Sequence, residues 1–379
     1  MNAAPPPPTS PTPSWRQRLL QQLRVEWQHL TTVQRSDRHW QVPLAATLAM
    51  GLPLLIGAWF KELGYGMLSS LGGMVFVHLP NTPMSHRMML MMACAAGMAG
   101  CYALGVMGQI LAPAAVVAVL SLIASLVTMV VRYYRIGPPG SLFFVMAAAL
   151  GAYTPAPWQA LPQSVGLVFL GALLAVLVAF GHSLLALRRQ AAGPLPPPPE
   201  ADFEFVVLEP VVIGACVGVS LAVAGALQLD RPYWVAVSCL AVIQGATLRA
   251  IWNKQLQRVL GTSVGLMLAW ALLAPAHTPW SLAFTMMGLA FIIESLVVRH
   301  YGVAAVFITP MTLMLAEAAQ LGHGLNVPAL MQARFIDTVL GCLLGLLGGL
   351  CLHWPRFRAA TGRGLRCFVP GRLRAAPKP

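Results

Sequence analysis

Long apolar runs, separated by short polar or basic breaks, cover most of the 379-residue chain. A bilayer core about 30 Å thick needs about 20 apolar residues in a helix, with about 17 as the minimum. By this measure the chain predicts twelve spans. They cover 41–60, 64–80, 88–111, 113–133, 139–153, 163–187, 206–229, 232–247, 256–274, 280–298, 302–320 and 334–353. The fifth and eighth ranges are short enough to be tilted, or broken inside the protein.

The composition supports the membrane interpretation. Hydrophobic residues make up 58% of the chain and charged residues only 9%, with a mean hydropathy of +0.71. A soluble globular chain carries roughly a quarter charged residues, so this chain lacks the polar surface that a soluble enzyme domain needs. The predicted fold class is therefore an all-α polytopic membrane protein.

A proline-rich linker divides the predicted spans into two sets of six. The stretch RRQAAGPLPPPPEADFE occupies 188–204, where the prolines stiffen the backbone and the charges keep both ends in water. The predicted parts are a Pro-rich and basic arm (1–40), a first six-helix half (41–187), the linker (188–205), a second six-helix half (206–353) and a basic tail (354–379).

Basic residues set the predicted orientation. Of the 24 Lys and Arg residues, all but Lys61, Arg231 and Arg334 fall on the N-terminal arm, on the C-terminal tail or on every second loop. Because such residues accumulate on cytoplasmic loops, both termini of this multi-pass protein are expected to be cytoplasmic. The formal charge of +13 therefore reflects topology, and without a basic stripe interleaved with aromatic residues it does not predict a nucleic-acid partner.

Catalytic and metal-binding motifs are missing from the sequence. It contains no nucleophile elbow, HExxH motif, phosphate loop, CxxC pair or Cys/His ligand spacing. We therefore expect no enzyme activity, no metal and no cofactor.

The two halves also align with each other at an offset of 167 residues. At that offset VVRYY (130–134) lies over VVRHY (297–301), Pro43 lies over Pro210, and Gly51 lies over Gly218. Six spans per half is an even number, so the halves would insert the same way round as parallel repeats. Such repeats place a substrate path where the two halves meet.

Ionisable residues inside predicted spans are expensive in lipid, so each is a functional candidate. Glu294 lies in the tenth span, where it either couples transport to protons or reaches the interface by snorkelling. Arg334 and Asp337 lie at the outer end of the twelfth span and share a helix face. They either pair with each other and lock the helix, or Arg334, with Glu317 of the eleventh span nearby, forms an outer anion gate.

The segment 232–265 is the richest in candidate residues. Gly261 and Gly265 form a GxxxG motif, which favours close helix packing. Arg258, with Gln244 and Thr247, would place a cation and hydrogen-bond donors at a cytoplasmic vestibule suited to a carboxylate. The basic residues here are explained equally well as topology determinants.

Three motifs in the second half resemble the fusaric acid resistance (FUSC-type) family of inner-membrane proteins. These motifs are PYW at 232–234 leading to Gln244 and Arg258-x-x-Gly261-Thr262-x-x-Gly265, RHYGVAAVFITP at 299–310, and Arg334-x-x-Asp337-Thr338-x-x-Gly341. The family includes aromatic acid exporters and is distantly similar to aluminium-activated malate transporters. The resemblance adds Thr262 to the expected substrate path and Gly341 to the expected packing positions.

The sequence also departs from the family pattern. Gly245 follows Gln244, where the family typically has proline, and at the offset of 167 Met91, Cys94 and Ala95 stand where the second half has Arg258, Gly261 and Thr262. A vestibule built from this motif would therefore be one-sided.

The resemblance implies proton-driven efflux of small organic anions, with aromatic carboxylic acids as the expected substrates. The alternatives are a passive organic-anion channel and a non-transporting accessory subunit of an envelope complex. The expected partners are membrane lipids and the organic anion. The resemblance also allows a periplasmic adaptor protein, and the sequence leaves a homo-oligomer open.

Overall fold

The computed structural model describes residues 33–34, 38–155, 157–189, 191–195, 202–273, 278–318 and 327–366, and every regular element in these ranges is helical. The first half contains α2 (Gln41–Trp59), α3 (Leu63–Gly73), η1 (Met74–His78), α4 (Met84–Gly108), α5 (Pro113–Tyr133), α6 (Leu142–Tyr153), η2 (Trp158–Ala160) and α7 (Leu161–Arg189). The rest contains η3 (Glu204–Leu208), α8 (Glu209–Ala226), α9 (Pro232–Ile243), α10 (Leu248–Leu273), α11 (Pro279–Leu296), α12 (Tyr301–Ala318), α13 (Val327–His353) and α14 (Pro355–Arg366). The predicted all-α fold class is confirmed.

Each of the twelve ranges predicted as spans falls on one of the helices α2 to α13. Within the described ranges, eight helices are long and apolar enough to cross a membrane, and α6, α9 and α12 are shorter apolar helices. The chain is therefore a multi-pass helical membrane protein, while the count of twelve spans stays a prediction. Three starts were predicted at least four residues too late, because α4 begins at Met84, α10 at Leu248 and α13 at Val327.

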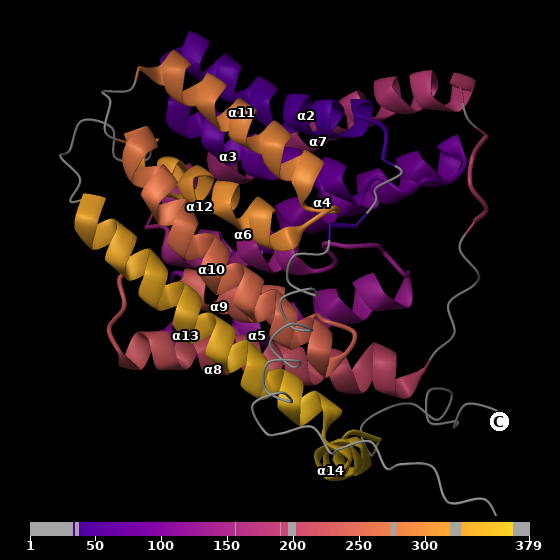
Figure 1. Cartoon of the computed structure of the whole chain (residues 1–379), viewed down its shortest axis with the longest axis vertical. Coiled ribbons are helices and arrows are strands. Elements are labelled where there is room, and N and C mark those ends of the chain that lie inside the picture. The colour runs from indigo at the N-terminus through magenta and orange to yellow at the C-terminus, as the bar shows by residue number, and fades with distance from the viewer. Residues whose placement is uncertain are drawn as a thin grey trace, which may run out of the picture.

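Helices at corresponding positions of the two halves pack in the same pairs. In the first half α4 packs against α6 and α7, and α3 against α7; in the second, α10 packs against α12 and α13, and α9 against α13. The most extensive contacts between the halves are α5 with α8 and α2 with α11, which lie at opposite ends of the long axis in Figure 1, and α6 also packs against α9. These pairings agree with a twofold arrangement, although the sequence repeat itself stays a prediction.

Helix α9 is a short helix inside the second half. Its 12 residues extend about 18 Å, too short to cross a bilayer core of about 30 Å. Every residue from Trp234 to Ile243 is buried, and α8 and α13 pack against the helix. A broken span is tolerated where protein surrounds it, so α9 can place polar side chains in the interior of the bundle.

Candidate functional site

Six side chains with polar or charged groups gather inside the second half, between α9, α10, α12 and α13. We call them the buried arginine cluster, which consists of Trp234, Ser238, Arg258, Tyr301, Arg334 and Asp337. The exposed fractions of Arg258, Arg334 and Asp337 are 6%, 3% and 1%. Three ionisable groups are therefore removed from solvent in one part of the bundle.

Arg258 of α10 is held between two neighbouring helices. Its Nη1 donates to the Tyr301 hydroxyl of α12 at 2.7 Å, and its Nη2 donates to Ser238 Oγ of α9 at 3.1 Å. Lys254, one turn earlier on α10, lies with its Nζ 5.2 Å from the centre of the Tyr301 ring. The Arg258 Nε has no hydrogen-bond partner among the described residues, so one donor of this guanidinium group remains unused.

Arg334 of α13 lies over an aromatic ring. Its Cζ is 3.9 Å from the centre of the Trp234 ring, within the range of a cation–π contact. Within the described part of the chain, Arg334 Nε and Nη1 and Asp337 Oδ1 have no hydrogen-bond partner. These three atoms therefore make no hydrogen bond between Arg334 and Asp337, whose direct pairing was one of the two expected arrangements.

Arg334 also lies deeper in the bundle than its predicted position at the outer end of a span. Because α13 begins at Val327, Arg334 is seven residues, or about 10 Å, inside the helix. The span was predicted to begin at the charged Arg334. The segment 327–333 before it is apolar except for Gln332, so hydropathy alone did not mark Arg334 as the start of the helix.

A small cavity adjoins Arg334 and Asp337. Its volume is about 10 Å³, and its lining includes Arg231, Trp234, Thr312, Arg334 and Asp337. This is room for about one water molecule. An organic anion can reach these groups only when the surrounding helices move apart.

The structure separates Glu294 from this cluster. Glu294 is 7% exposed on α11. The positive charge of Arg38 attracts its carboxylate. Helix α11 packs against α2 of the first half, which places the carboxylate near the boundary between the halves. Glu317 lies near the end of α12, and its side chain is outside the described residues.

Gln244 and Thr247 contact groups outside the buried arginine cluster. Gln244 Nε2 donates to Ser141 Oγ of the first half at 3.0 Å, and the Thr128 hydroxyl donates to the same oxygen at 2.8 Å. Thr247 is exposed, and its Oγ1 accepts a hydrogen bond from the Ala250 N–H at the start of α10. Gln244 therefore links the two halves, whereas Thr247 caps a helix.

The expected packing positions are sites of very close helix contact. A Cβ at Gly261 would lie 2.6 Å from Ala305 Cβ of α12, and a Cβ at Gly265 would lie 2.6 Å from the Val306 carbonyl oxygen. On α13, a Cβ at Gly341 would lie 2.3 Å from the Val235 carbonyl oxygen of α9. These glycines bring the helices of the buried arginine cluster together. Thr262 is buried one turn after Arg258 on α10.

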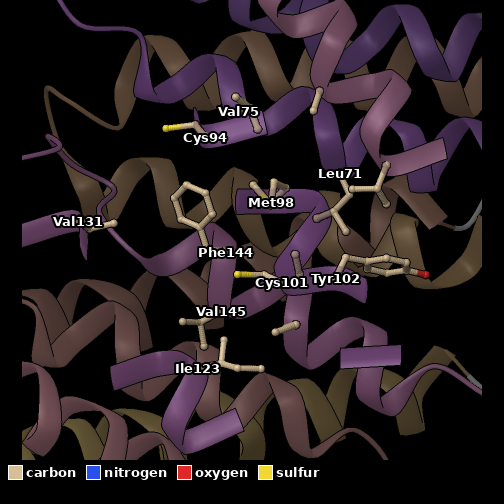
Figure 2. Close-up of a cluster of buried hydrophobic side chains, with 14 of the residues drawn as sticks. Leu71, Val75, Cys94, Met98, Cys101, Tyr102, Ile123, Val131, Phe144 and Val145 are labelled. Atoms are coloured by element: carbon tan, nitrogen blue, oxygen red, sulfur yellow. The ribbon is translucent and has the colours of Figure 1, made fainter. Parts of the chain in front are cut away.

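The positions of the first half that align with residues of this site are apolar. Met91, Cys94 and Ala95, which align with Arg258, Gly261 and Thr262, are 0%, 2% and 0% exposed. Figure 2 shows Leu71, which aligns with Ser238, and Cys94 in a core of apolar side chains with Met98, Phe144 and Val145. At these aligned positions the described part of the first half therefore lacks the arginine and serine of the cluster. Its buried arginine, Arg87, lies one turn before Met91 on α4 and donates to Ser183 and Asn81.

Sequence reasoning assigned no role to Arg231, Trp234, Ser238 or Tyr301. The sequence carried a signal for Trp234 and Tyr301, because they belong to the PYW and RHY motifs. Ser238 lies four residues after Trp234, on the same face of a helix. Arg231 was counted only as a loop charge, and its place beside the cavity depends on how α13 packs against α9.

Comparison with known proteins gives matches to the region of the chain that contains the buried arginine cluster. Residues 214–348 match the family model of fusaric acid resistance protein-like proteins, and this range contains the whole buried arginine cluster. The chain is 35% identical over 132 residues to the uncharacterized membrane protein YvaC of Bacillus subtilis (strain 168), covering 35% of this chain and 20% of that protein. It is 31% identical over 142 residues to the uncharacterized protein YhfK of Escherichia coli (strain K12), covering 36% of this chain and 19% of that protein.

The matched region thus spans about a fifth of the length of each of these relatives. No solved structure matches the chain. The expected resemblance to the fusaric acid resistance family is confirmed for the region that contains the cluster.

Proposed function

We propose that this protein is a membrane transporter for small organic anions and that the buried arginine cluster binds the anion. One observation carries the proposal: Arg258 and Arg334 are both buried, and Asp337 is the only carboxylate of the cluster. An unpaired charge inside a membrane protein costs several kcal/mol. A site that binds an anion gives a physical reason to keep a second buried cation.

Carboxylates suit the donors of this cluster. The planar guanidinium group presents N–H donors in a geometry that matches the two oxygens of a carboxylate. In the part of the chain that the structure describes, the donors without a hydrogen-bond partner are Nε of Arg258 and Nε and Nη1 of Arg334. The rings of Trp234 and Tyr301 offer surfaces on which an aromatic acid could pack. The similarity to fusaric acid resistance proteins favours the same class of substrate.

For energy coupling we propose proton-driven efflux, with Glu294 as the coupling carboxylate. Glu294 is buried on α11, and α11 packs against α2 of the other half. If the halves rock against each other during transport, the surroundings of Glu294 change with each cycle. A passive channel would need no such group.

The test is uptake of labelled benzoate into proteoliposomes that contain the purified full-length chain. An imposed pH gradient should drive accumulation, and a protonophore should abolish it. Arg334→Gln should abolish uptake, while Arg188→Gln, which removes an exposed arginine at the end of α7, should leave it unchanged.

Other outcomes separate the alternatives. Uptake that persists after the protonophore would indicate a passive channel. No uptake of any organic acid by folded protein would contradict transport and favour an accessory membrane subunit.

The coupling role of Glu294 has its own test. Glu294→Gln should retain exchange of labelled for unlabelled benzoate but should lose accumulation driven by the pH gradient. Accumulation equal to that of the unchanged protein would remove Glu294 from the mechanism and leave the anion site untouched.

A further inference from the structure

A second, larger pocket opens where α5 ends and η3 begins. Its volume is about 480 Å³, and it is lined by Val131, Arg132, Arg135, Ile136, Asp202 and Phe205. This volume is typical of sites for small molecules. None of these residues belongs to the buried arginine cluster, so the pocket is a separate feature.

Ion pairs hold the inner wall of this pocket in place. Arg132 forms an ion pair with Glu209, donates to the Phe205 carbonyl oxygen at 3.1 Å, and places its Cζ 4.6 Å from the centre of the Phe205 ring. Arg358 of α14 pairs with Glu204 and lies 3.6 Å from Glu209. The pairs join the end of α5, the start of α8 and α14 into one structure.

Helix α14 has one face docked on the protein and one basic face. On the docked face, Phe357 packs against the main core and a Cβ at Gly362 would lie 3.9 Å from Phe203. On the other face Arg356 and Arg363 are exposed, while Arg366 at the end of the helix places its Cζ 5.1 Å from the centre of the Phe203 ring. Figure 1 shows α14 almost end-on, while α13 runs across the view. If α13 crosses the membrane, α14 therefore lies along the membrane surface, as interfacial basic helices do.

Aromatic and apolar side chains place this end of the bundle at the border of the hydrocarbon core. Tyr134 at the end of α5 and Trp354 just before α14 are 61% and 59% exposed. Exposed tyrosine and tryptophan gather at the membrane interface. Earlier in α5, Leu126 and Val130 are about half exposed, as expected for side chains that face acyl chains.

We propose that the pocket and the basic face of α14 form a binding site for the headgroup of an anionic phospholipid. Arg135 would face the phosphate from the pocket, and the arginines of α14 would add positive potential at the surface. Val131, Ile136 and Phe205 suit the glycerol and the first acyl carbons. A zwitterionic headgroup brings its own cation towards these arginines and therefore binds more weakly.

The test compares lipids that stay with the purified full-length chain. After extraction from bilayers of phosphatidylcholine mixed with phosphatidylglycerol, native mass spectrometry should find phosphatidylglycerol enriched over phosphatidylcholine. Arg135→Gln and Arg356→Gln should each weaken this retention by about fivefold. Arg135→Lys, which keeps the charge, should restore most of it.

The matched control is Lys61→Gln, which removes an exposed cation from the opposite predicted side of the membrane and should leave lipid retention unchanged. Equal retention of both lipids, or retention unaffected by the Gln variants, would overturn the proposal. Thermal protection by soluble glycerol phosphate equal to that by the lipid would assign the pocket to a free phosphate compound instead. Arg334→Gln should not change lipid retention, so this site and the transport site fail or succeed separately.

Discussion

At the scale of single residues, the surroundings of Arg334 differ from those of an ordinary buried ion pair. The guanidinium group lies 3.9 Å over the Trp234 ring, and Asp337 shares its small cavity without a direct hydrogen bond at Oδ1. A pair kept only for stability would be expected to close. The open arrangement leaves donors for a ligand and keeps a carboxylate close enough to limit the cost of the buried cation.

Arg334→Gln and the double variant Arg334→Gln/Asp337→Asn separate charge balance from anion binding. The single variant leaves Asp337 without the cation that shares its cavity, and an uncompensated buried charge destabilises the fold by several kcal/mol. The double variant removes both charges and should recover most of the melting temperature. Benzoate uptake should stay lost in both, and recovery of uptake in the double variant would contradict the assignment of Arg334.

Tyr301 offers a second test at this scale. Tyr301→Phe keeps the ring beside Lys254 but removes the oxygen that accepts from Arg258 Nη1 at 2.7 Å. Leaving that donor unpaired should cost about 1–3 kcal/mol and lower benzoate uptake. Circular dichroism melts and uptake assays measure the two effects, and unchanged values for both would show that Tyr301 does not position Arg258.

At the scale of elements, the short helix α9 depends on its contact with α13. Glycines of α13 let the two backbones approach so closely that a Cβ at Gly341 would lie 2.3 Å from the Val235 carbonyl oxygen. The same contact brings Trp234 and Ser238 towards the arginines. The geometry of the buried arginine cluster therefore depends on residues that carry no charge.

Gly341→Ala should force α9 and α13 apart. Overpacking of this kind costs about 1–3 kcal/mol, and the displaced ring of Trp234 should also weaken anion binding. The matched control is Gly288→Ala on α11, where a Cβ would meet nothing within 4 Å and where alanine favours the helix. Equal melting temperatures for the two variants would show that the close approach has no energetic consequence.

At the scale of the whole molecule, contact between the halves involves long helices and not only the linker. Helix α5 packs against α8 and α2 against α11 (Figure 1). Gln244 adds a hydrogen bond from α9 to Ser141 of the first half. We therefore expect the halves to associate even when the chain is cut between them.

Co-expression of 1–195 with 196–379 should recover both pieces when only one carries an affinity tag. Gly214→Leu should prevent this recovery, because a Cβ at Gly214 of α8 would lie 2.6 Å from the Ser121 carbonyl oxygen of α5. Gly225→Leu, on the same helix but with nothing within 4 Å of its Cβ, should not. Loss of association in the Gly225 variant as well would point to a general folding defect.

The sequence predicted the helices well and the site in part. Arg258, Arg334, Asp337 and Glu294 were identified because charge inside an apolar run is visible without a structure. Gln244 and Thr247 were grouped with Arg258 from their nearness in sequence, but the turn after α9 directs Gln244 to the first half and Thr247 to the start of α10. Proximity along the chain does not determine direction at the end of a helix.

The sequence by itself determined that this is a helical membrane protein, which helices it has, and which residues carry buried charge, because these follow from hydropathy and length. The tertiary structure decided which charges meet. It placed Arg258 and Arg334 together with Trp234 in one half, left the aligned positions of the other half apolar, and moved Glu294 to the boundary between them. Those outcomes depend on glycine contacts and helix pairings between distant segments, which local patterns do not contain.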